Sequence, residues 1–362
     1  MAGPLPRPGI LEIHPYIGGK AEASHGMPVA KLSSNESPLG PSPKAQQAYR
    51  ELAGELHRYP DGGANRLRAA LSAYANRDAE RIVCGAGSDE LISLILQAYA
   101  GPGDEVIHSA HGFLMYRLST LAVGAQPVAA PERDLRASVD DILAAVTSRT
   151  KIVFLANPNN PTGTYLPAQE VERLAYGLPD GVLLVLDAAY TEYVEAEDYD
   201  VGFDLVDRSD RVVVIRTFSK IFGLAALRLG WAYGPASIVA VLNRVRGPFN
   251  TNAPSQAATI AALGDTDHLT KAKHHNAVWL PWLSQELHRC GLEVTASVGN
   301  FVLARFGDDP KTGADAALSH FEQGGVLVRG MAAYGLPAWL RISIGLEEEN
   351  RRVVSLTEKL VH

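Results

Sequence analysis

The chain has 362 residues, of which 46% are hydrophobic and 20% are charged, and its formal net charge is −7. This balance is typical of a soluble globular protein with a substantial core, and it argues against a nucleic-acid-binding protein. Two cysteines, Cys84 and Cys290, offer no disulfide framework, and neither has the spaced companions that a zinc site requires.

The start of the chain lacks the basic residues and apolar core of a signal peptide, and no apolar run approaches the length of a membrane span. We therefore expect a cytoplasmic protein. The first 40 or so residues are rich in proline, glycine and serine, with the turn-forming run Pro-Leu-Gly-Pro-Ser-Pro at 38–43. They predict an N-terminal arm over residues 1–44 that joins the smaller domain.

From residue 45 to about 250, apolar runs typical of buried strands alternate with helical segments. The expected strands lie at 82–84, 105–107, 151–155, 182–186 and 212–215. Such alternation predicts an α/β fold with a mainly parallel sheet and helices on both of its faces. We assign residues 45–253 to a large domain of this kind.

The last third of the chain has a different pattern. An alanine-rich helical stretch follows Pro254, and a long amphipathic segment occupies about 267–290. Further strands are expected near 300–305, 326–328 and 340–344. Together they predict a smaller α+β domain over residues 254–362.

A glycine turn follows the first expected strand, in the sequence Gly85-Ala86-Gly87-Ser88-Asp89-Glu90, and an apolar helical run comes next. Backbone N–H groups at such a helix start bind anions, so this turn is a candidate phosphate cup. A dinucleotide fingerprint would need a third glycine at position 90, which is glutamate, and the chain contains no GxxxxGK[ST] loop. These departures disfavour a nicotinamide-dependent dehydrogenase.

Two later strands end in residues suited to an aldehyde cofactor. Lys220 comes soon after the run 212–215, where a lysine amine can form a Schiff base in a pocket at the strand end. Asp187 follows the run 182–186, and beside pyridoxal phosphate its carboxylate would keep the ring nitrogen protonated. Each residue has a structural alternative, because lysines are mostly exposed and aspartate favours turns.

Neighbouring polar residues extend this candidate site. Tyr190 and Asn160 can hydrogen-bond the 3-oxygen of the same ring, Asn160 from the loop after strand 151–155. Arg228 offers a planar donor to phosphate oxygens, and Ser219 adds a hydroxyl.

The motifs occur in the order GAGSDE, NPNNPTG, DAAY, SK and LRLG, and this set resembles the fold-type I pyridoxal-phosphate aminotransferases of class I and II. Within that group the chain is most similar to the histidinol-phosphate aminotransferase family. The similarity rests on Ile13-His14-Pro15-Tyr16-Ile17-Gly18-Gly19-Lys20, on the stretch from Leu32 to Pro43, and on Arg58-Tyr59-Pro60, and it extends from about Ile10 to the C-terminus.

The resemblance implies a role for each matching residue. Lys220 is expected to bind the cofactor and shuttle protons, Asp187 to pair with the ring nitrogen, and Asn160 and Tyr190 to contact the 3-oxygen. The other cofactor contacts are expected from Gly87, Ser88, Asp89, Ser219 and Arg228. Tyr59 would reach the partner subunit's cofactor, which implies a homodimer with shared active sites.

Substrate recognition is implied for Arg341, which would bind the carboxylate of glutamate or the phosphate of the other substrate. Arg329, Tyr16, Asn160 and Tyr59 resemble helpers in this recognition, although Arg341 alone could be a surface residue and Tyr16 and Arg329 could belong to the scaffold.

The sequence departs from the family pattern in two places. Ser37 stands where the family usually has the second asparagine of Asn-Glu-Asn-Pro. In the segment 109–116 the aromatic that should stack on the cofactor ring is not obvious, and we favour Phe113, with His111 as the rival.

The resemblance implies transamination between histidinol phosphate and 2-oxoglutarate, in histidine biosynthesis, with no metal ion. Aromatic amino acid aminotransferases and decarboxylases of phosphorylated amino acids share the scaffold and remain alternatives. A non-catalytic sensor fused to a DNA-binding domain is a third, but the N-terminal arm leaves no room for a helix-turn-helix domain. The expected partners are therefore small-molecule substrates and a second copy of the chain.

Overall fold

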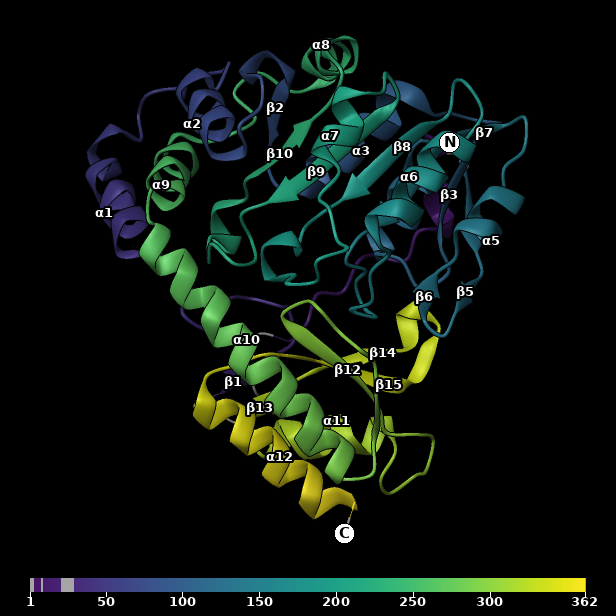
Figure 1. Ribbon diagram of the computed structural model, residues 1–362, viewed down its shortest axis with the longest axis vertical. Helices are drawn as coiled ribbons and strands as arrows, with labels where there is room; N and C mark the ends of the chain where they lie inside the picture. The colour runs from purple at the N-terminus through teal and green to yellow at the C-terminus, as the bar shows by residue number, and fades with distance from the viewer. Residues whose placement is uncertain (1–2, 8, 21–28, 362) are drawn as a thin grey trace.

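The computed structural model describes residues 3–7, 9–20 and 29–361; parts of the predicted N-terminal arm, residues 1–2, 8 and 21–28, lie outside the described residues, as does residue 362. The described chain forms a large body around a seven-stranded sheet and a smaller body around a four-stranded sheet (Figure 1). Among the described residues, no helix is long and apolar enough to cross a membrane.

The central sheet is parallel except for one strand. Its order is β2 (Ile82–Gly85), β10 (Gly230–Tyr233), β9 (Val212–Thr217), β8 (Leu183–Asp187), β7 (Thr150–Ala156), β3 (Glu105–Ser109) and β4 (Gln126–Ala130). Strand β10 runs antiparallel to both of its neighbours. The expected mainly parallel sheet is confirmed, while β4 and β10 were not among the strands predicted from the sequence.

Helices cover both faces of this sheet because alternate residues of each strand point to opposite sides. In β7, Val153 and Leu155 join one buried cluster, and Ile152 and Phe154 join another. The first cluster includes residues of α1 (Pro43–Glu51), α2 (Asn65–Ala75), α5 (Val139–Ala144), α6 (Ala168–Gly177), α7 (Phe203–Asp207) and α9 (Ala253–Leu263). The second includes residues of α3 (Ser88–Tyr99), α4 (Leu114–Ala122) and α8 (Ala236–Val245).

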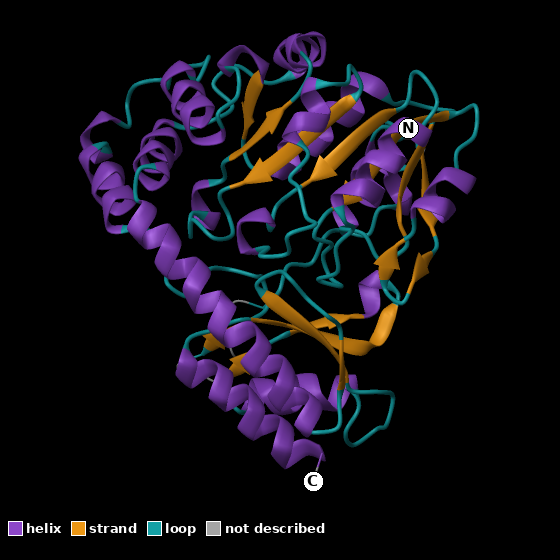
Figure 2. Ribbon diagram, viewed as in Figure 1, coloured by secondary structure: helices purple, strands orange, loops and turns teal. Residues whose placement is uncertain are grey.

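The long helix α10 (Thr266–Arg289) runs from the large body to the smaller one (Figure 2). There, in the described part of the chain, four strands pair in the order β11 (Glu293–Val294), β12 (Phe301–Arg305), β15 (Leu336–Ser343) and β14 (Arg329–Met331). Helices α11 (Ala314–Gln323) and α12 (Glu347–Val361) pack beside this sheet. The amphipathic pattern at 267–290 is thus a helix, as predicted.

The expected strand at 326–328 ends at residue 327, and a separate strand in another sheet begins at residue 329. Strand β13 (Val326–Leu327) pairs with β1 (Ala30–Lys31) of the N-terminal arm, whereas β14 pairs with β15. This pairing ties the arm to the smaller body. The division at residue 253 stays a prediction; helix α9, just after it, packs against α1 and α2.

The remaining elements are short. The hairpin strands β5 (Glu132–Arg133) and β6 (Arg136–Ala137) pair with each other. Short 3-10 helices occur at η1 (Ile10–Glu12), η2 (Ala53–Glu55), η3 (Ala79–Arg81), η4 (Thr191–Tyr193), η5 (Ala225–Leu227) and η6 (Ala332–Tyr334).

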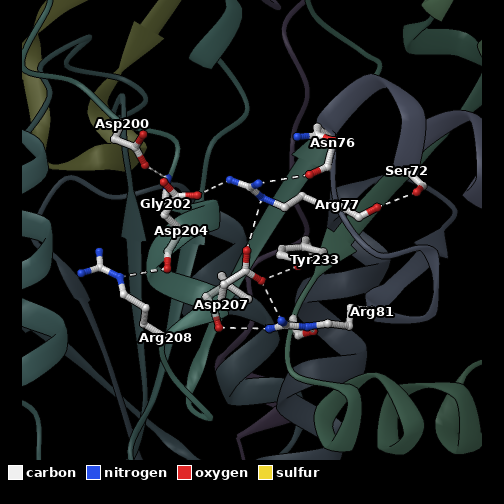
Figure 3. Close-up of polar contacts among 12 residues, drawn as sticks. Ser72, Asn76, Arg77, Arg81, Asp200, Gly202, Asp204, Asp207, Arg208 and Tyr233 are labelled. Carbon is white, nitrogen blue, oxygen red and sulfur yellow. Dashed lines mark hydrogen bonds and ion pairs between the residues drawn. The ribbon is translucent and has the colours of Figure 1, made fainter.

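A polar cluster holds the amino end of β2 and the carboxyl end of β10 to helix α7 (Figure 3). The Asp207 carboxylate accepts hydrogen bonds from Arg81 Nη1 at 2.6 Å and from Tyr233 Oη at 2.5 Å, and Arg77 Nε lies 3.5 Å away. Arg77 also pairs with Asp204. This network lies at the end of the sheet opposite Lys220, and we assign it a structural role.

Candidate active site

A cavity of about 240 Å³ opens where β7, β8 and β9 end. Open α/β sheets bind ligands at this edge because the carboxyl ends of their parallel strands leave a crevice there. The cavity is lined by Tyr16, Gly18, Gly19, Ser34, Asn35, Ser88, Asp89, Phe113, Tyr116, Ala156, Pro158, Asn160, Asp187, Ala189, Tyr190, Thr217, Ser219, Lys220, Arg228, Arg329 and Arg341. Of the predicted site residues, Gly87 and Tyr59 alone are outside this lining set.

Lys220 lies three residues beyond the end of β9 and reaches into the cavity. Its Nζ donates a hydrogen bond to the Ser34 carbonyl oxygen at 3.2 Å and lies 5.6 Å from the centroid of the Tyr190 ring. Desolvation lowers the pKa of Lys220 from 10.5 to about 8, and the positive charge of Arg341 contributes to this shift. The lowered pKa increases the neutral fraction of Lys220 near physiological pH, and the neutral amine is the nucleophilic form.

Asp187 is the last residue of β8, and its side chain is buried. Its Oδ2 accepts a hydrogen bond from Tyr116 Oη at 2.7 Å, whereas its Oδ1 is buried with no partner among the described residues. Burial raises the pKa of this carboxyl from 3.8 to about 6. Because a buried unpaired acceptor is costly, Oδ1 is suited to accept a hydrogen bond from a bound ligand, ideally from a cationic N–H group.

Tyr116 was missed in the sequence, although it lies in the segment 109–116 that drew attention to Phe113. It is fully buried and stacks on Phe154 of β7, with ring centroids 4.7 Å apart. Its i, i+3 spacing from Phe113 at the start of α4 places both residues on one helix face, where both line the cavity. That spacing is the signal that would have identified it.

The glycine turn that we predicted to bind phosphate lies where α3 begins at Ser88. Arg228 crosses this helix start, with Nη2 donating to Asp89 Oδ2 at 3.0 Å and Nη1 to Ser219 Oγ at 3.3 Å. A Cβ atom at Gly87, whose φ is +89°, would lie only 2.6 Å from Arg228 Nη2. Gly87 thus allows the guanidinium to lie directly against the backbone, beside N–H groups that can bind an anion.

The opposite side of the cavity carries two arginines. Arg341 of β15 is buried; its Nη1 donates to Asn160 Oδ1 and its Nη2 to the Ser33 carbonyl oxygen at 2.9 Å. The guanidinium of Arg329 lies 5.1 Å from the centroid of the Tyr16 ring and donates to the Ile17 carbonyl oxygen at 3.0 Å. Within the described chain, both arginines donate to neutral oxygens and neither pairs with a carboxylate, so both are available to an anionic ligand.

The two rivals for ring stacking are placed differently. Phe113 lines the cavity, whereas His111 is outside the lining set and its Nδ1 lies 2.9 Å from Glu132 Oε2. The backbone N–H of His111 also donates to Glu132, at 3.0 Å. Only Phe113 of the two therefore lies where it can contact a ligand in the cavity, and its stacking role stays a prediction.

Tyr59 does not contribute to the cavity of its own chain. It is 82% exposed and stacks on Phe249, with ring centroids 4.6 Å apart. Such an exposed aromatic pair is available to another molecule.

The family model described as Aminotransferase class I and II matches residues 28–355. The chain belongs to this family. The family expected from the motif order is therefore confirmed, and the match spans both bodies of this aminotransferase.

Two curated relatives of this aminotransferase are named histidinol-phosphate aminotransferase. The protein from Paramagnetospirillum magneticum is 57% identical over 361 residues, covering 100% of this chain and 99% of the relative. The protein from Rhodospirillum rubrum is 54% identical over 351 residues, covering 97% of this chain and 95% of the relative.

A solved structure is also similar to this aminotransferase. It is histidinol-phosphate aminotransferase from Sinorhizobium meliloti in complex with pyridoxal-5'-phosphate, with a TM-score of 0.87, 30% identity, and coverage of 93% of this chain and 92% of that one. The predicted fold-type I architecture is confirmed by this likeness.

Proposed function

We propose that this aminotransferase uses pyridoxal 5'-phosphate and transfers the amino group of histidinol phosphate to 2-oxoglutarate, a step of histidine biosynthesis. The two relatives at 57% and 54% identity, both of that name over almost their full length, support the substrate assignment. The motif set and the site geometry support the cofactor.

The residues of the cavity fit pyridoxal phosphate at three points. The unpaired buried Oδ1 of Asp187 is suited to a protonated ring nitrogen. The start of α3, with Ser219 and Arg228, is suited to the phosphate. Lys220, with its lowered pKa of about 8, is suited to the aldehyde. Tyr190, Asn160 and Phe113 complete the proposed contacts, to the 3-oxygen and to the ring face.

The observation that carries the substrate proposal is the pair Arg329 and Arg341, which line the cavity without a carboxylate partner in the described chain. Two uncompensated guanidinium groups favour a ligand with negative charge remote from its amine. Histidinol phosphate carries such a charge on its phosphate, and glutamate carries two carboxylates. One site can therefore bind both substrates in turn.

When bound, the cofactor supplies an aldehyde that condenses with amines and a ring that withdraws electrons from the substrate α-carbon. Lys220 Nζ removes the proton from that carbon, and general base catalysis of this kind contributes roughly 10²- to 10⁴-fold in rate. Asp187 keeps the ring nitrogen protonated, because its carboxylate favours the charged N–H form. Arg341 orients the substrate through its anionic group.

We also propose that the enzyme is a cytoplasmic homodimer with shared active sites. The exposed Tyr59–Phe249 pair supports an interface at this face. In the dimer, Tyr59 would reach the cofactor phosphate and the substrate in the partner's cavity, which explains why it does not line its own.

The first experiment is to record the visible absorption spectrum of the purified protein with pyridoxal phosphate and then add histidinol phosphate. We expect the band of the lysine-bound cofactor to disappear and to return on addition of 2-oxoglutarate. A response to phenylalanine alone, or a preference for threonine phosphate, would refute the substrate assignment and retain the cofactor. The absence of any lysine-dependent band, with Lys220→Ala as the control, would refute the cofactor itself.

A further inference from the structure

Three consecutive residues of the N-terminal arm contact three residues of the proposed site. The Ser33 carbonyl oxygen accepts from Arg341, the Ser34 carbonyl oxygen accepts from Lys220, and Asn35 Nδ2 donates to Tyr190 Oη at 2.9 Å. Of these contacts, only the one from Asn35 is made by a side chain. Its amide therefore influences Tyr190 in a way that depends on residue type.

Asn35 is held rigidly. It is fully buried, its φ is +55°, and its carbonyl oxygen accepts from Asn300 Nδ2 at 3.1 Å. Its own backbone N–H donates to Ser343 Oγ at 2.8 Å, and Ser343 Oγ lies 3.1 Å from Asn35 Oδ1. Asparagine tolerates a left-handed backbone better than most residues, which suits it to this place.

The positions of the protons in this network follow from the number of donors. Ser343 Oγ accepts from the backbone N–H of Asn35, and its single hydroxyl proton is donated to Asn35 Oδ1, its one acceptor among the described residues. The Asn35 NH₂ group must then face Tyr190. The opposite amide orientation would leave the Ser343 proton without an acceptor among the described residues, in a place where Ser343 is 1% exposed.

The orientation of the Asn35 amide determines where the Tyr190 O–H proton points. Its oxygen accepts a hydrogen bond from Asn35, so its own O–H proton cannot point toward Asn35. Among the described residues no acceptor receives that proton, and both Tyr190 and Asn35 line the cavity. The hydroxyl is protonated at neutral pH, because burial raises the pKa of Tyr190 to about 12.

We propose that Ser343 and Asn35 form a hydrogen-bond relay that fixes Tyr190 as a donor toward the cavity, where its proton stabilises the anionic 3-oxygen of the cofactor. Asn35 and Ser343 are positioning residues, because they act through Tyr190. The relay rests on the proposed cofactor. It also links the strand of Arg341, two residues before Ser343, to the cofactor side of the site.

Asn35→Asp reverses the relay with almost no change in shape. A carboxylate has no proton to donate, so Tyr190 would turn its proton toward residue 35 and away from the cavity. Ser343→Ala is the milder and uncharged variant, because it removes the group that orients the amide. The groups that surround Tyr190 are unchanged in both variants: Arg341, Asp187, Lys220, Tyr16 and Tyr334.

The test is a pH titration of the visible cofactor band without substrate, for each variant with Tyr190 intact and combined with Tyr190→Phe. We expect Asn35→Asp to raise the pH midpoint by about one unit, since one unit corresponds to the loss of about one hydrogen bond to a charged group. Ser343→Ala should raise it by less. In the Tyr190→Phe background the Ser343→Ala shift should vanish, and the Asn35→Asp shift should shrink to the effect of the added charge.

Midpoint shifts of equal size with Tyr190 intact and with Tyr190→Phe would overturn the relay. An effect that persists without the Tyr190 hydroxyl cannot depend on the direction of its proton. Unchanged midpoints in Asn35→Asp and Ser343→Ala, with a shifted midpoint in Tyr190→Phe, would overturn it as well. Asn276→Asp is the matched control, since Asn276 is a buried amide that donates to the Gly299 carbonyl oxygen and not to Tyr190. Thermal unfolding of each variant separates loss of folding from loss of the relay, and Ser343→Ala decides the question if Asn35→Asp does not fold.

The outcomes distinguish the relay from the proposed function. If the wild-type protein shows no visible band with pyridoxal phosphate, the cofactor assignment fails. If the band forms and titrates but its pH midpoint does not change on substitution of residue 35 or 343, only the relay fails.

Discussion

Gly230 is a single position at which one added methyl group should damage the phosphate cup. It is the first residue of β10 and pairs with Gly85 on one side and Thr217 on the other. An ideal Cβ at this position would lie 2.5 Å from Ser88 N, 2.7 Å from Gly87 C and 2.9 Å from the Arg216 carbonyl oxygen. All three are backbone atoms of the sheet or of the helix start, so no side chain can rotate away.

The size of the effect follows from these distances. Non-bonded carbon atoms attract best at about 3.5–4.0 Å, so Gly230→Ala must push the start of α3 away from β10 by about 1 Å. Overpacking of this kind costs about 1–3 kcal/mol of stability. A displaced N–H group that no longer reaches a charged phosphate loses about 1.5–3 kcal/mol, which corresponds to about 10- to 100-fold in affinity.

The assay is titration of the apoprotein with pyridoxal phosphate, with thermal unfolding measured in parallel. Gly101→Ala is the control, because a Cβ at that glycine meets no atom within 4 Å. We expect Gly230→Ala to bind the cofactor at least about tenfold more weakly and Gly101→Ala to bind it normally. A folded Gly230→Ala protein with wild-type affinity would refute the reasoning that this close approach shapes the cup.

Three further predictions concern the proposed catalytic groups. Asp187→Asn should stabilise the apoprotein at about pH 7.5 by up to about 3 kcal/mol, because the pKa of Asp187 rises from 3.8 to about 6 and the ionised form is costly when buried. Because folding raises this pKa, the gain in the free energy of unfolding, measured with urea, should shrink as the pH falls through about 6 toward 4. An equal gain at about pH 7.5 and at about pH 4 would contradict the prediction. Labelling of apoprotein Lys220 by an amine-reactive reagent should rise with a midpoint near its lowered pKa of about 8, and a midpoint near 10.5 would contradict the desolvation. A mixture of Tyr59→Ala and Lys220→Ala chains should recover about a quarter of wild-type activity, because half the dimers are mixed and each has one intact site; no recovery would argue against a shared site.

The sequence predicted the residues at the strand ends because they obey local rules. Asp187 and Lys220 follow apolar runs typical of buried strands, and the glycines at 85 and 87 mark a turn between a strand and a helix. Parallel strands align their carboxyl ends at one edge of the sheet, and Asp187 and Lys220, which follow the adjacent strands β8 and β9, meet in one cavity there. Most of the proposed site could therefore be predicted without coordinates.

The elements that the sequence did not reveal are those whose pairing is non-local. Strand β10 is four residues long and has little periodicity, and only its neighbours β2 and β9 make it a strand. Strand β1 has two residues and exists because β13, about 300 residues later, pairs with it. Such short strands carry too little local signal to stand out in a sequence.

Within the site, Lys220 could be predicted from the sequence because it belongs to a local motif, whereas Asn35 could not, because its contacts are non-local. The sequence by itself determined the fold class, the family and the chemistry, because the residues that carry them belong to motifs with fixed spacing around strand ends. Only the tertiary structure decided which groups support them: Tyr116 beneath Asp187, and Asn35 with Ser343 behind Tyr190. These contacts join residues 71 to 308 positions apart, and hydrogen bonds across such separations are set by packing, which leaves no pattern along the chain.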